Sequence, residues 1–137
     1  MRNFKFKEPI LGVHEFDRNV HLDERGYFTE LCNEQLEGFL EVKFVQDNVS
    51  YNQKAGTWRG LHAQREPHAQ GKLVTCLQGK AMVVVVDIRK NSDTLLKHDI
   101  FLMSERKSLY VPEGCLHGFL TAQEDVLFHY KVTKPYH

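Results

Sequence analysis

The chain reads Lys72-Leu-Val-Thr-Cys-Leu-Gln-Gly-Lys-Ala-Met-Val-Val-Val-Val-Asp-Ile88 near its middle, two apolar runs around the dipeptide Gly79-Lys80. β-branched residues favour strands, and a glycine followed by a polar residue is typical of a two-residue hairpin turn. We therefore expect 72–78 and 81–88 to pair as a β-hairpin. The run of valines from Val83 to Val86 predicts a strand that is buried on both faces.

The same pattern of short strands continues on both sides of this stretch. Turn signals occur at Asp23-Glu-Arg-Gly26, Asn91-Ser-Asp93 and Pro112-Glu-Gly114, and only Asn33 to Phe39 is typical of a helix. The expected strands are Gly26 to Cys32, Phe44 to Ser50, Thr94 to Leu102, Ser108 to Val111 and Val126 to Thr133. Short strands at this spacing predict an all-β fold, a small antiparallel barrel or jelly roll that occupies residues 1–137 as a single domain.

Composition excludes several classes of function. The 137 residues contain 18 Lys plus Arg and 18 Asp plus Glu, so there is no basic footprint for nucleic acid. The longest apolar run, Ala81 to Val86, is too short to span a membrane, and the charged N-terminus is unlike a signal peptide. Three cysteines without Cys-x-x-Cys spacing predict reduced thiols and a cytoplasmic location.

Polar residues cluster in Gly56-Thr-Trp-Arg-Gly-Leu-His-Ala-Gln64 and in Pro67-His-Ala-Gln-Gly-Lys-Leu-Val74. If 58–64 is a strand, His62 and Gln64 point to the same side, and Lys72 lies beside them if the two strands pair. Burying such groups is costly unless they serve a ligand. The alternative is a solvated rim of the barrel, with these charges outside.

Two further segments carry candidate residues. In Val111-Pro-Glu-Gly-Cys-Leu-His-Gly-Phe119 a tight turn returns His117 into a strand, which resembles the second motif of cupin barrels. Cupins have His-x-His in their first motif, whereas this chain has His62-Ala-Gln64; a metal site of His62, His68 and His117 is a weaker alternative. Tyr130 alternates with Phe128 and Val132, and it could equally be a core tyrosine whose hydroxyl reaches the surface.

Together these segments resemble the dTDP-4-dehydrorhamnose 3,5-epimerase family. The order and spacing of the matching stretches carry the resemblance over nearly the whole chain. They are 23–30 (Asp-Glu-Arg-Gly-Tyr-Phe-Thr-Glu), 44–50, 58–64 (Trp-Arg-Gly-Leu-His-Ala-Gln), 70–74, 86–89, 111–119, and Tyr130 with Tyr136.

The resemblance implies an enzyme that inverts carbons next to the ketone of a nucleotide-linked 4-keto-6-deoxy sugar. His62 matches the base, Tyr130 the acid on the opposite face, and Lys72 the cation beside the keto oxygen. No metal or organic cofactor is implied. The matches for sugar, diphosphate and nucleotide binding are Arg25, Phe28, Glu30, Gln46, Asn48, Arg59, His117 and Tyr136.

The chain departs from the family in one respect. Family members carry an Asp, the partner of the catalytic His, in a segment after the second Tyr, and only His137 follows Tyr136 here. Asp87, Glu66 or a carboxylate of a second subunit could replace it. Losing such an orienting carboxylate can cost on the order of 10⁴ in rate.

Three other interpretations remain open at this point. They are a single-centre epimerase or keto-isomerase of a related sugar nucleotide, a non-catalytic sugar-nucleotide-binding barrel, and a metal-dependent cupin. We also expect a homodimer, because Phe4, Phe6 and Ile10 offer apolar strand material to the sheet edge of a neighbour.

Overall fold

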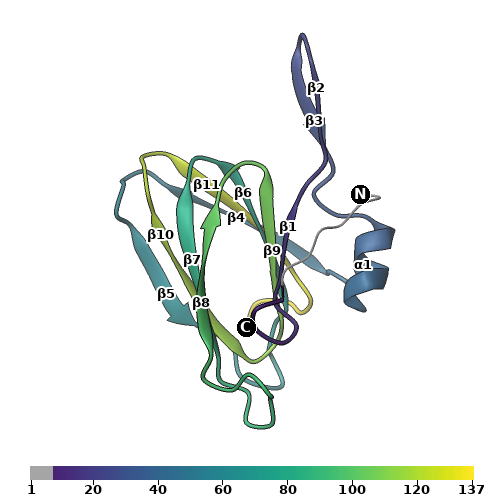
Figure 1. Cartoon of the computed structure of the whole chain (residues 1–137), viewed down its shortest axis with the longest axis vertical. Coiled ribbons are helices and arrows are strands. Elements are labelled where there is room, and N and C mark those ends of the chain that lie inside the picture. Colours follow the sequence, from purple (N-terminus) through teal and green to yellow (C-terminus); the bar gives the residue numbers. More distant parts are fainter. Residues whose placement is uncertain (1–7) are drawn as a thin grey trace.

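The computed structural model describes residues 8–137, and they form two antiparallel sheets that face each other (Figure 1). One sheet has the strand order β1-β9-β6-β11-β4 and the other has the order β5-β10-β7-β8. The first comprises β1 (His14–Asp17), β9 (Lys107–Val111), β6 (Lys72–Gln78), β11 (Val126–Val132) and β4 (Gln46–Asn52). The second comprises β5 (Trp58–His62), β10 (Cys115–Thr121), β7 (Ala81–Asp87) and β8 (His98–Met103). The predicted jelly-roll architecture is confirmed.

The expected hairpin around Gly79-Lys80 is wrong, although both of its strands exist. β6 pairs with β9 and β11, whereas β7 pairs with β8 and β10, so the chain passes from one sheet to the other at this turn. Gly79 makes the crossing possible, because its φ of +87° is left-handed and a Cβ there would meet a Val126 methyl at 2.8 Å. The two strands face each other across the core instead of pairing edge to edge.

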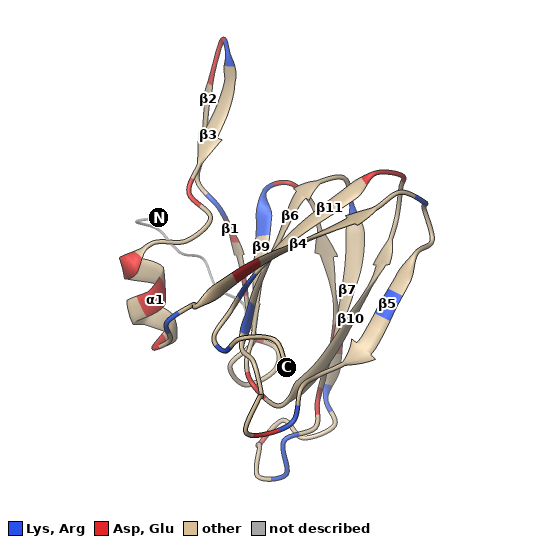
Figure 2. Ribbon diagram, turned by 180° about the vertical axis from the view of Figure 1, so that it is seen from behind, with Lys and Arg blue, Asp and Glu red and all other residues tan. Residues whose placement is uncertain are grey.

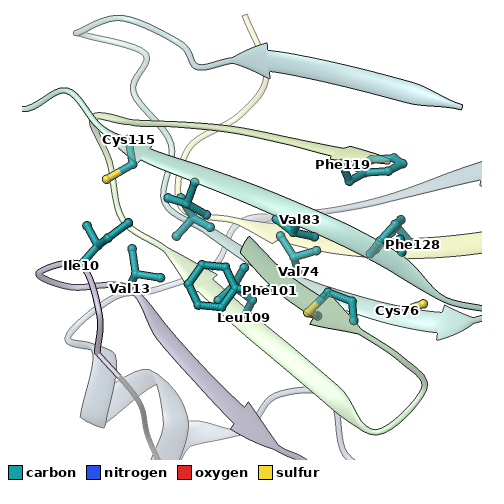
Figure 3. Packing of buried hydrophobic residues seen from close by; sticks show 14 of the residues in the cluster. Ile10, Val13, Val74, Cys76, Val83, Phe101, Leu109, Cys115, Phe119 and Phe128 are labelled. Atoms are coloured by element: carbon teal, nitrogen blue, oxygen red, sulfur yellow. The ribbon is translucent and has the colours of Figure 1, made fainter. Parts of the chain in front are cut away.

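The core lies between the sheets and follows the two-residue period of the strands (Figure 3). Val74 of β6 and Phe128 of β11 meet Val83 of β7, Phe101 of β8 and Phe119 of β10 in one cluster. The expectation that the valine run is buried on both faces needs correction. Val83 and Val85 are fully buried, but Val84 and Val86 point outward and are only half-buried.

A short helix covers the outer face of the five-stranded sheet. The helix α1 (Glu34–Leu40) begins after Asn33, whose side-chain oxygen accepts a hydrogen bond from the Leu36 backbone N–H at 3.0 Å. This agrees with the helix expected at 33–39. Leu36 is fully buried in a second apolar cluster with Phe16, Leu73 and Tyr110.

A separate hairpin extends beyond the sandwich (Figure 1). It consists of β2 (Val20–Asp23) and β3 (Gly26–Thr29), which pair only with each other. The pattern did not predict β1 or β2, and β3 is shorter than the expected strand at 26–32. Leu22 and Phe28 on this hairpin are 67% and 68% exposed.

Of the three N-terminal residues expected to pair with the sheet edge of a neighbouring copy, the structure describes one. Phe4 and Phe6 lie outside the described residues. Ile10 is 1% exposed and packs in the core of its own chain, so it is not available to a neighbour. Pairing through this residue is therefore wrong.

Three overall properties of residues 8–137 are the distribution of their charges, the length of their helices and the state of their cysteines. Acidic and basic positions are interspersed over the loops at both ends of the sandwich (Figure 2). No helix in this part of the chain is long and apolar enough to cross a membrane. Cys32, Cys76 and Cys115 are free thiols, as predicted.

Candidate active site

The inner face of β4, at the edge of the five-stranded sheet, is polar, whereas the core cluster between the sheets is apolar. On β4 the inward positions are Gln46, Asn48, Ser50 and Asn52, and the residues between them are exposed. A strand with one polar face toward the interior needs hydrogen-bonding partners there. These side chains find them on β5 and β11 or among themselves.

His62 of β5, His117 of β10 and Lys72 of β6 meet, and of these His117 is buried, Lys72 is half-buried and His62 is exposed. His62 is the Cα partner of His117 across β5 and β10, and their rings lie edge to face with centroids 4.6 Å apart. Lys72 reaches them from the opposite sheet, and its Nζ lies 3.3 Å from His117 Nε2. The predicted proximity of Lys72 and His62 is thus correct, but it arises across the sandwich rather than by pairing of their strands. The alternative of a solvated rim is wrong for His117, which is buried, and for Lys72, which is half-buried, whereas His62 stays solvent-exposed.

Burial and the nearby charge of Lys72 disfavour the protonated form of both imidazoles in this cluster. Burial lowers the pKa of His62, and the ammonium of Lys72 lowers it further. The pKa of His117 falls well below its ordinary value for the same reasons, with His62 as an additional cause. Burial also lowers the pKa of Lys72. At neutral pH both imidazoles are therefore neutral, and His62 is able to accept a proton.

Tyr130 enters the same interior from β11. Its hydroxyl lies 3.2 Å from Ser50 Oγ, and its ring stacks on Phe128. Burial raises the pKa of Tyr130 to about 12, while the hydrogen bond to Ser50 and the charge of Arg59 oppose the rise. The alternative of a hydroxyl at the surface is wrong. Tyr130 is a protonated acid at neutral pH.

Close contact between β5 and β10 positions both Arg59 and His62. Gly60 has a φ of +126°, and a Cβ there would come within 2.6 Å of Gly118 Cα. Only glycines allow the two backbones to approach so closely. Arg59, on one side of this contact, donates from Nε to Asn52 Oδ1 at 2.7 Å. His62, on the other side, borders a groove that is also lined by Leu61, Ile88 and Leu116.

Three of the positions matched to nucleotide binding are connected to each other. Gln46 donates from Nε2 to Asn48 Oδ1 at 2.8 Å and accepts the Tyr136 backbone N–H at 3.3 Å. The Tyr136 side chain is mostly exposed, so its ring face is open to a ligand. Gln64 lies beyond the end of β5 rather than on the same strand as His62. It accepts the His137 backbone N–H at 3.1 Å.

Three other matched positions are not brought to this site by their own chain. Arg25 and Phe28 lie on the projecting β2–β3 hairpin, where Arg25 forms a 2.7 Å ion pair with Asp23. Glu30 follows β3 and accepts a hydrogen bond from Asn33, next to the start of α1. Figures 1 and 2 show this hairpin beyond the sandwich.

The two carboxylates of this chain that could replace the family's Asp do not do so. Asp87 is fully buried and is bound by Arg89, Ser92 and Thr94. Glu66 pairs with Lys134 at 3.6 Å. Within residues 8–137, no ion pair between His62 and a carboxylate is formed.

The grouping of His62, His68 and His117 as metal ligands is also not formed. His68 stacks on His137 with ring centroids 3.5 Å apart, while His62 and His117 contact each other. Residues 8–137 contain no group of three or more His, Cys, Asp or Glu side chains that could hold a metal ion.

The sequence reasoning missed Ser50 and Asn52. Asn52 is 2% exposed and connects Arg59 to Ser50, which in turn contacts Tyr130. A signal was present in Gln46-Asp-Asn-Val-Ser-Tyr-Asn52, where every second residue is polar. Strand alternation places these polar residues on one face, and the resemblance had already assigned Gln46 and Asn48 to the site.

Comparison with known proteins gives a consistent result. A curated dTDP-4-dehydrorhamnose 3,5-epimerase from Methanothermobacter thermautotrophicus is 44% identical over 142 residues, covering 100% of this chain and 76% of its own length. The corresponding protein from Salmonella typhimurium is 47% identical over 135 residues, covering 95% of this chain and 73% of its own. The chain thus spans about three quarters of the length of these relatives.

Solved structures agree with the sequence relatives. The Bacillus anthracis dTDP-4-dehydrorhamnose 3,5-epimerase, with TDP and PPi bound, superposes with a TM-score of 0.92 at 38% identity, covering 98% of this chain and 80% of its own. A Legionella pneumophila epimerase in complex with dTDP-4-keto-L-rhamnose has a TM-score of 0.90 at 35% identity, with coverages of 98% and 74%. The family model for dTDP-4-dehydrorhamnose 3,5-epimerase matches residues 7–137. The chain therefore belongs to the dTDP-4-dehydrorhamnose 3,5-epimerase family.

Proposed function

We propose that this protein epimerises a dTDP-linked 4-keto-6-deoxy sugar at the carbons next to its ketone, through an enolate. One observation carries the proposal. His62 on β5 and Tyr130 on β11 come from opposite sheets, and the directions of their pKa shifts favour a neutral imidazole and a protonated phenol at neutral pH. Inversion requires removal of a proton from one face and its return on the other, which is what such a pair can do.

Each of the three central groups has one role. His62 takes the proton α to the ketone, which breaks the C–H bond and leaves its electron pair in the enolate. Lys72 lies close to His117 and supplies the positive charge that stabilises the enolate oxygen. Tyr130 then donates its proton to the opposite face of the carbon. The reaction is redox-neutral, and these proton transfers need no cofactor.

Polar residues around this centre hold the rest of the substrate. Arg59 suits the diphosphate because its guanidinium offers a fork of donors, and His117 lines the sugar. Gln46 and Asn48 suit the nucleobase. Tyr136, with its exposed ring, can stack on the base.

A homodimer accounts for the three matched residues that lie away from this site. The β2–β3 hairpin projects from its own sandwich and exposes Leu22 and Phe28. Within one chain Arg25 and Phe28 stay on this hairpin, so a role in nucleotide binding requires the site of a second copy. The hairpin would then bury its apolar residues at the same time. A cytoplasmic location remains part of the proposal, and the three free thiols support it.

Turnover in deuterated water tests the function. The protein is incubated with dTDP-4-keto-6-deoxyglucose, and deuterium is read at each carbon next to the ketone. We expect incorporation at both carbons with wild type and with His98→Ala, a control for an exposed histidine on β8. His62→Ala should abolish incorporation, whereas Tyr130→Phe should retain exchange but slow inversion by about 10² to 10⁴.

The other outcomes identify the alternatives. Incorporation at one carbon indicates a single-centre epimerase, the class of a Streptomyces bikiniensis 3'-monoepimerase that superposes with a TM-score of 0.89 at 26% identity. Binding of the sugar nucleotide without incorporation indicates a non-catalytic binding protein. Full exchange in His62→Ala contradicts the assigned base.

A further inference from the structure

The amide of Asn52 has only one possible orientation. Arg59 donates from Nε to the amide at 2.7 Å, and a guanidinium has no acceptor, so the amide oxygen faces Arg59. The amide nitrogen then faces the Val126 carbonyl at 3.2 Å and Ser50 Oγ at 3.3 Å. A carbonyl only accepts, so Arg59 and Val126 require the same orientation of Asn52.

This orientation decides the direction of the next hydrogen bond. Asn52 donates to Ser50 Oγ, which leaves the hydroxyl hydrogen of Ser50 available. Within residues 8–137 the hydroxyl of Tyr130, at 3.2 Å, is the one acceptor that this hydrogen reaches. Ser50 therefore donates to Tyr130, and the hydrogen of the Tyr130 hydroxyl is not held by Ser50.

We propose that Asn52 and Ser50 are positioning residues that direct the proton of Tyr130 toward the substrate. The proposal rests on the proposed role of Tyr130 as the acid. When Tyr130 reacts, its O–H bond breaks and a C–H bond forms on the enolate carbon. The electron pair of the O–H bond remains on the phenolate oxygen, which still accepts from Ser50, and water later returns a proton to it.

The electrostatics of Tyr130 support this assignment. Burial raises the pKa of Tyr130 to about 12, which would make it a weak acid for the reaction. The hydrogen bond from Ser50 and the charge of Arg59 act in the opposite direction. The three residues that precede Tyr130 in this hydrogen-bonded series thus both aim its proton and stabilise the charge that remains.

A pair of variants at Ser50 tests the role in turnover. In deuterated water, exchange at the substrate carbon reports His62, and inversion reports Tyr130. Ser50→Ala should slow inversion about tenfold, the value of one hydrogen bond to a developing charge, and leave exchange and KM near wild type. Ser50→Thr, which keeps a hydroxyl, should restore inversion. Equal loss of exchange and inversion in Ser50→Ala would show a merely structural role and overturn the proposal.

A second measurement needs no substrate. The Cζ resonance of Tyr130 in protein with ¹³C-labelled tyrosine, assigned with Tyr130→Phe, reports the hydrogen bonds of its hydroxyl. In Asn52→Asp the new carboxylate still accepts from Arg59 but cannot donate to Ser50. The Ser50 hydroxyl then turns toward this carboxylate, and Tyr130 becomes the donor to Ser50. We expect the resonance to move in Asn52→Asp and in Ser50→Ala, and to return toward wild type in Ser50→Thr.

The two measurements separate this proposal from the proposed function. If the resonance moves in Asn52→Asp and Ser50→Ala but wild type exchanges no deuterium, the proposed function is contradicted and the hydrogen-bond direction stands. Normal turnover with an unmoved resonance in Ser50→Ala would overturn the role of Ser50 and Asn52 and keep the function. If Asn52→Asp fails to fold, the Ser50 pair decides alone.

Discussion

The ammonium group of Lys72 adds to the effect of burial on two histidines. Lys72 crosses from the five-stranded sheet to His117, and the pKa values of His117 and His62 are lowered first by burial and then by the charge of Lys72. A lysine buried among two imidazoles costs solvation energy, and the site retains it where an enolate oxygen would develop charge. Its electrostatic effect on His62 can be measured separately from its effect on the enolate.

Replacing Lys72 by methionine should shift the acid limb of the pH profile. His62 works as a base in its neutral form, and its pKa is lowered first by burial and then by Lys72. Lys72→Met removes the repulsion, so the pKa of His62 rises and activity is lost at a higher pH than in wild type. Histidine ring resonances followed from pH 5 to 8 check this, with the exposed Lys97→Met as control. An unchanged His62 titration would contradict it.

The sequence could predict the catalytic residues better than the residues that position them. His62, Lys72, His117 and Tyr130 stand in motifs whose order carries the resemblance. The structure brings the first three together and places Tyr130 on β11, the strand paired with the β6 strand of Lys72. Ser50 and Asn52 differ, because their importance depends on partners on β5 and β11. Strand pairing places β11 beside β4, and β5 reaches β4 from the other sheet through the Arg59–Asn52 hydrogen bond.

At the scale of the elements, side-chain hydrogen bonds to Asp87 hold the β7–β8 connection. Asp87, at the end of β7, is fully buried and accepts hydrogen bonds from the Arg89 side chain, from Ser92 at 2.5 Å and from Thr94 at 2.6 Å. Arg89 also donates to the Leu11 carbonyl, and Thr94 Oγ1 accepts the Leu11 N–H at 3.1 Å. One carboxylate thus ties this connection to the N-terminal segment.

Asp87→Asn should therefore destabilise the fold by about 3–5 kcal/mol, the usual result of breaking a buried pair from one side. The hydrogen bonds hold the pKa of Asp87 well below its usual value, chiefly through Arg89. Because the folded-state pKa is depressed, this stabilisation is complete at neutral pH and declines as the pH falls below about 4. Urea unfolding of Asp87→Asn beside the exposed Asp93→Asn, at pH 7 and at pH 3, measures both effects. If the two variants differ as much in their free energy of unfolding at pH 3 as at pH 7, the charge-based explanation is contradicted.

Strands were predictable from local pattern, whereas their partners were not. The apolar alternation of β6 and β7 correctly indicates two strands, and Gly79-Lys80 correctly indicates a turn. A glycine turn of this kind suits a hairpin or a crossing between sheets equally well. The choice depends on β9, β10 and β11, which follow much later in the chain and fill the neighbouring positions. For the same reason β1 was missed, since its four residues are a strand only beside β9.

At the scale of the whole molecule, the β2–β3 hairpin raises the question of which sandwich it serves. Arg25 matches a group that lines the sugar and diphosphate path, and Phe28 matches the base-binding segment. Both lie on a hairpin that projects from its own chain (Figure 1). If the hairpin completes the site of a second copy, a chain that lacks His62 can still supply its hairpin. A chain that lacks Phe28 can likewise still supply its catalytic centre.

Mixing two inactive variants tests this arrangement. In a dimer of His62→Ala with Phe28→Ala, one site would combine an intact His62 with an intact Phe28, and the other would lack both. Random reassociation makes half of the dimers mixed, so about a quarter of all sites should regain activity. The control mixes His62→Ala with His62→Ala,Phe28→Ala, in which no complete site can form. If sedimentation shows mixed dimers and activity does not return, the hairpin serves its own chain. A monomer at micromolar concentration would contradict the dimer itself.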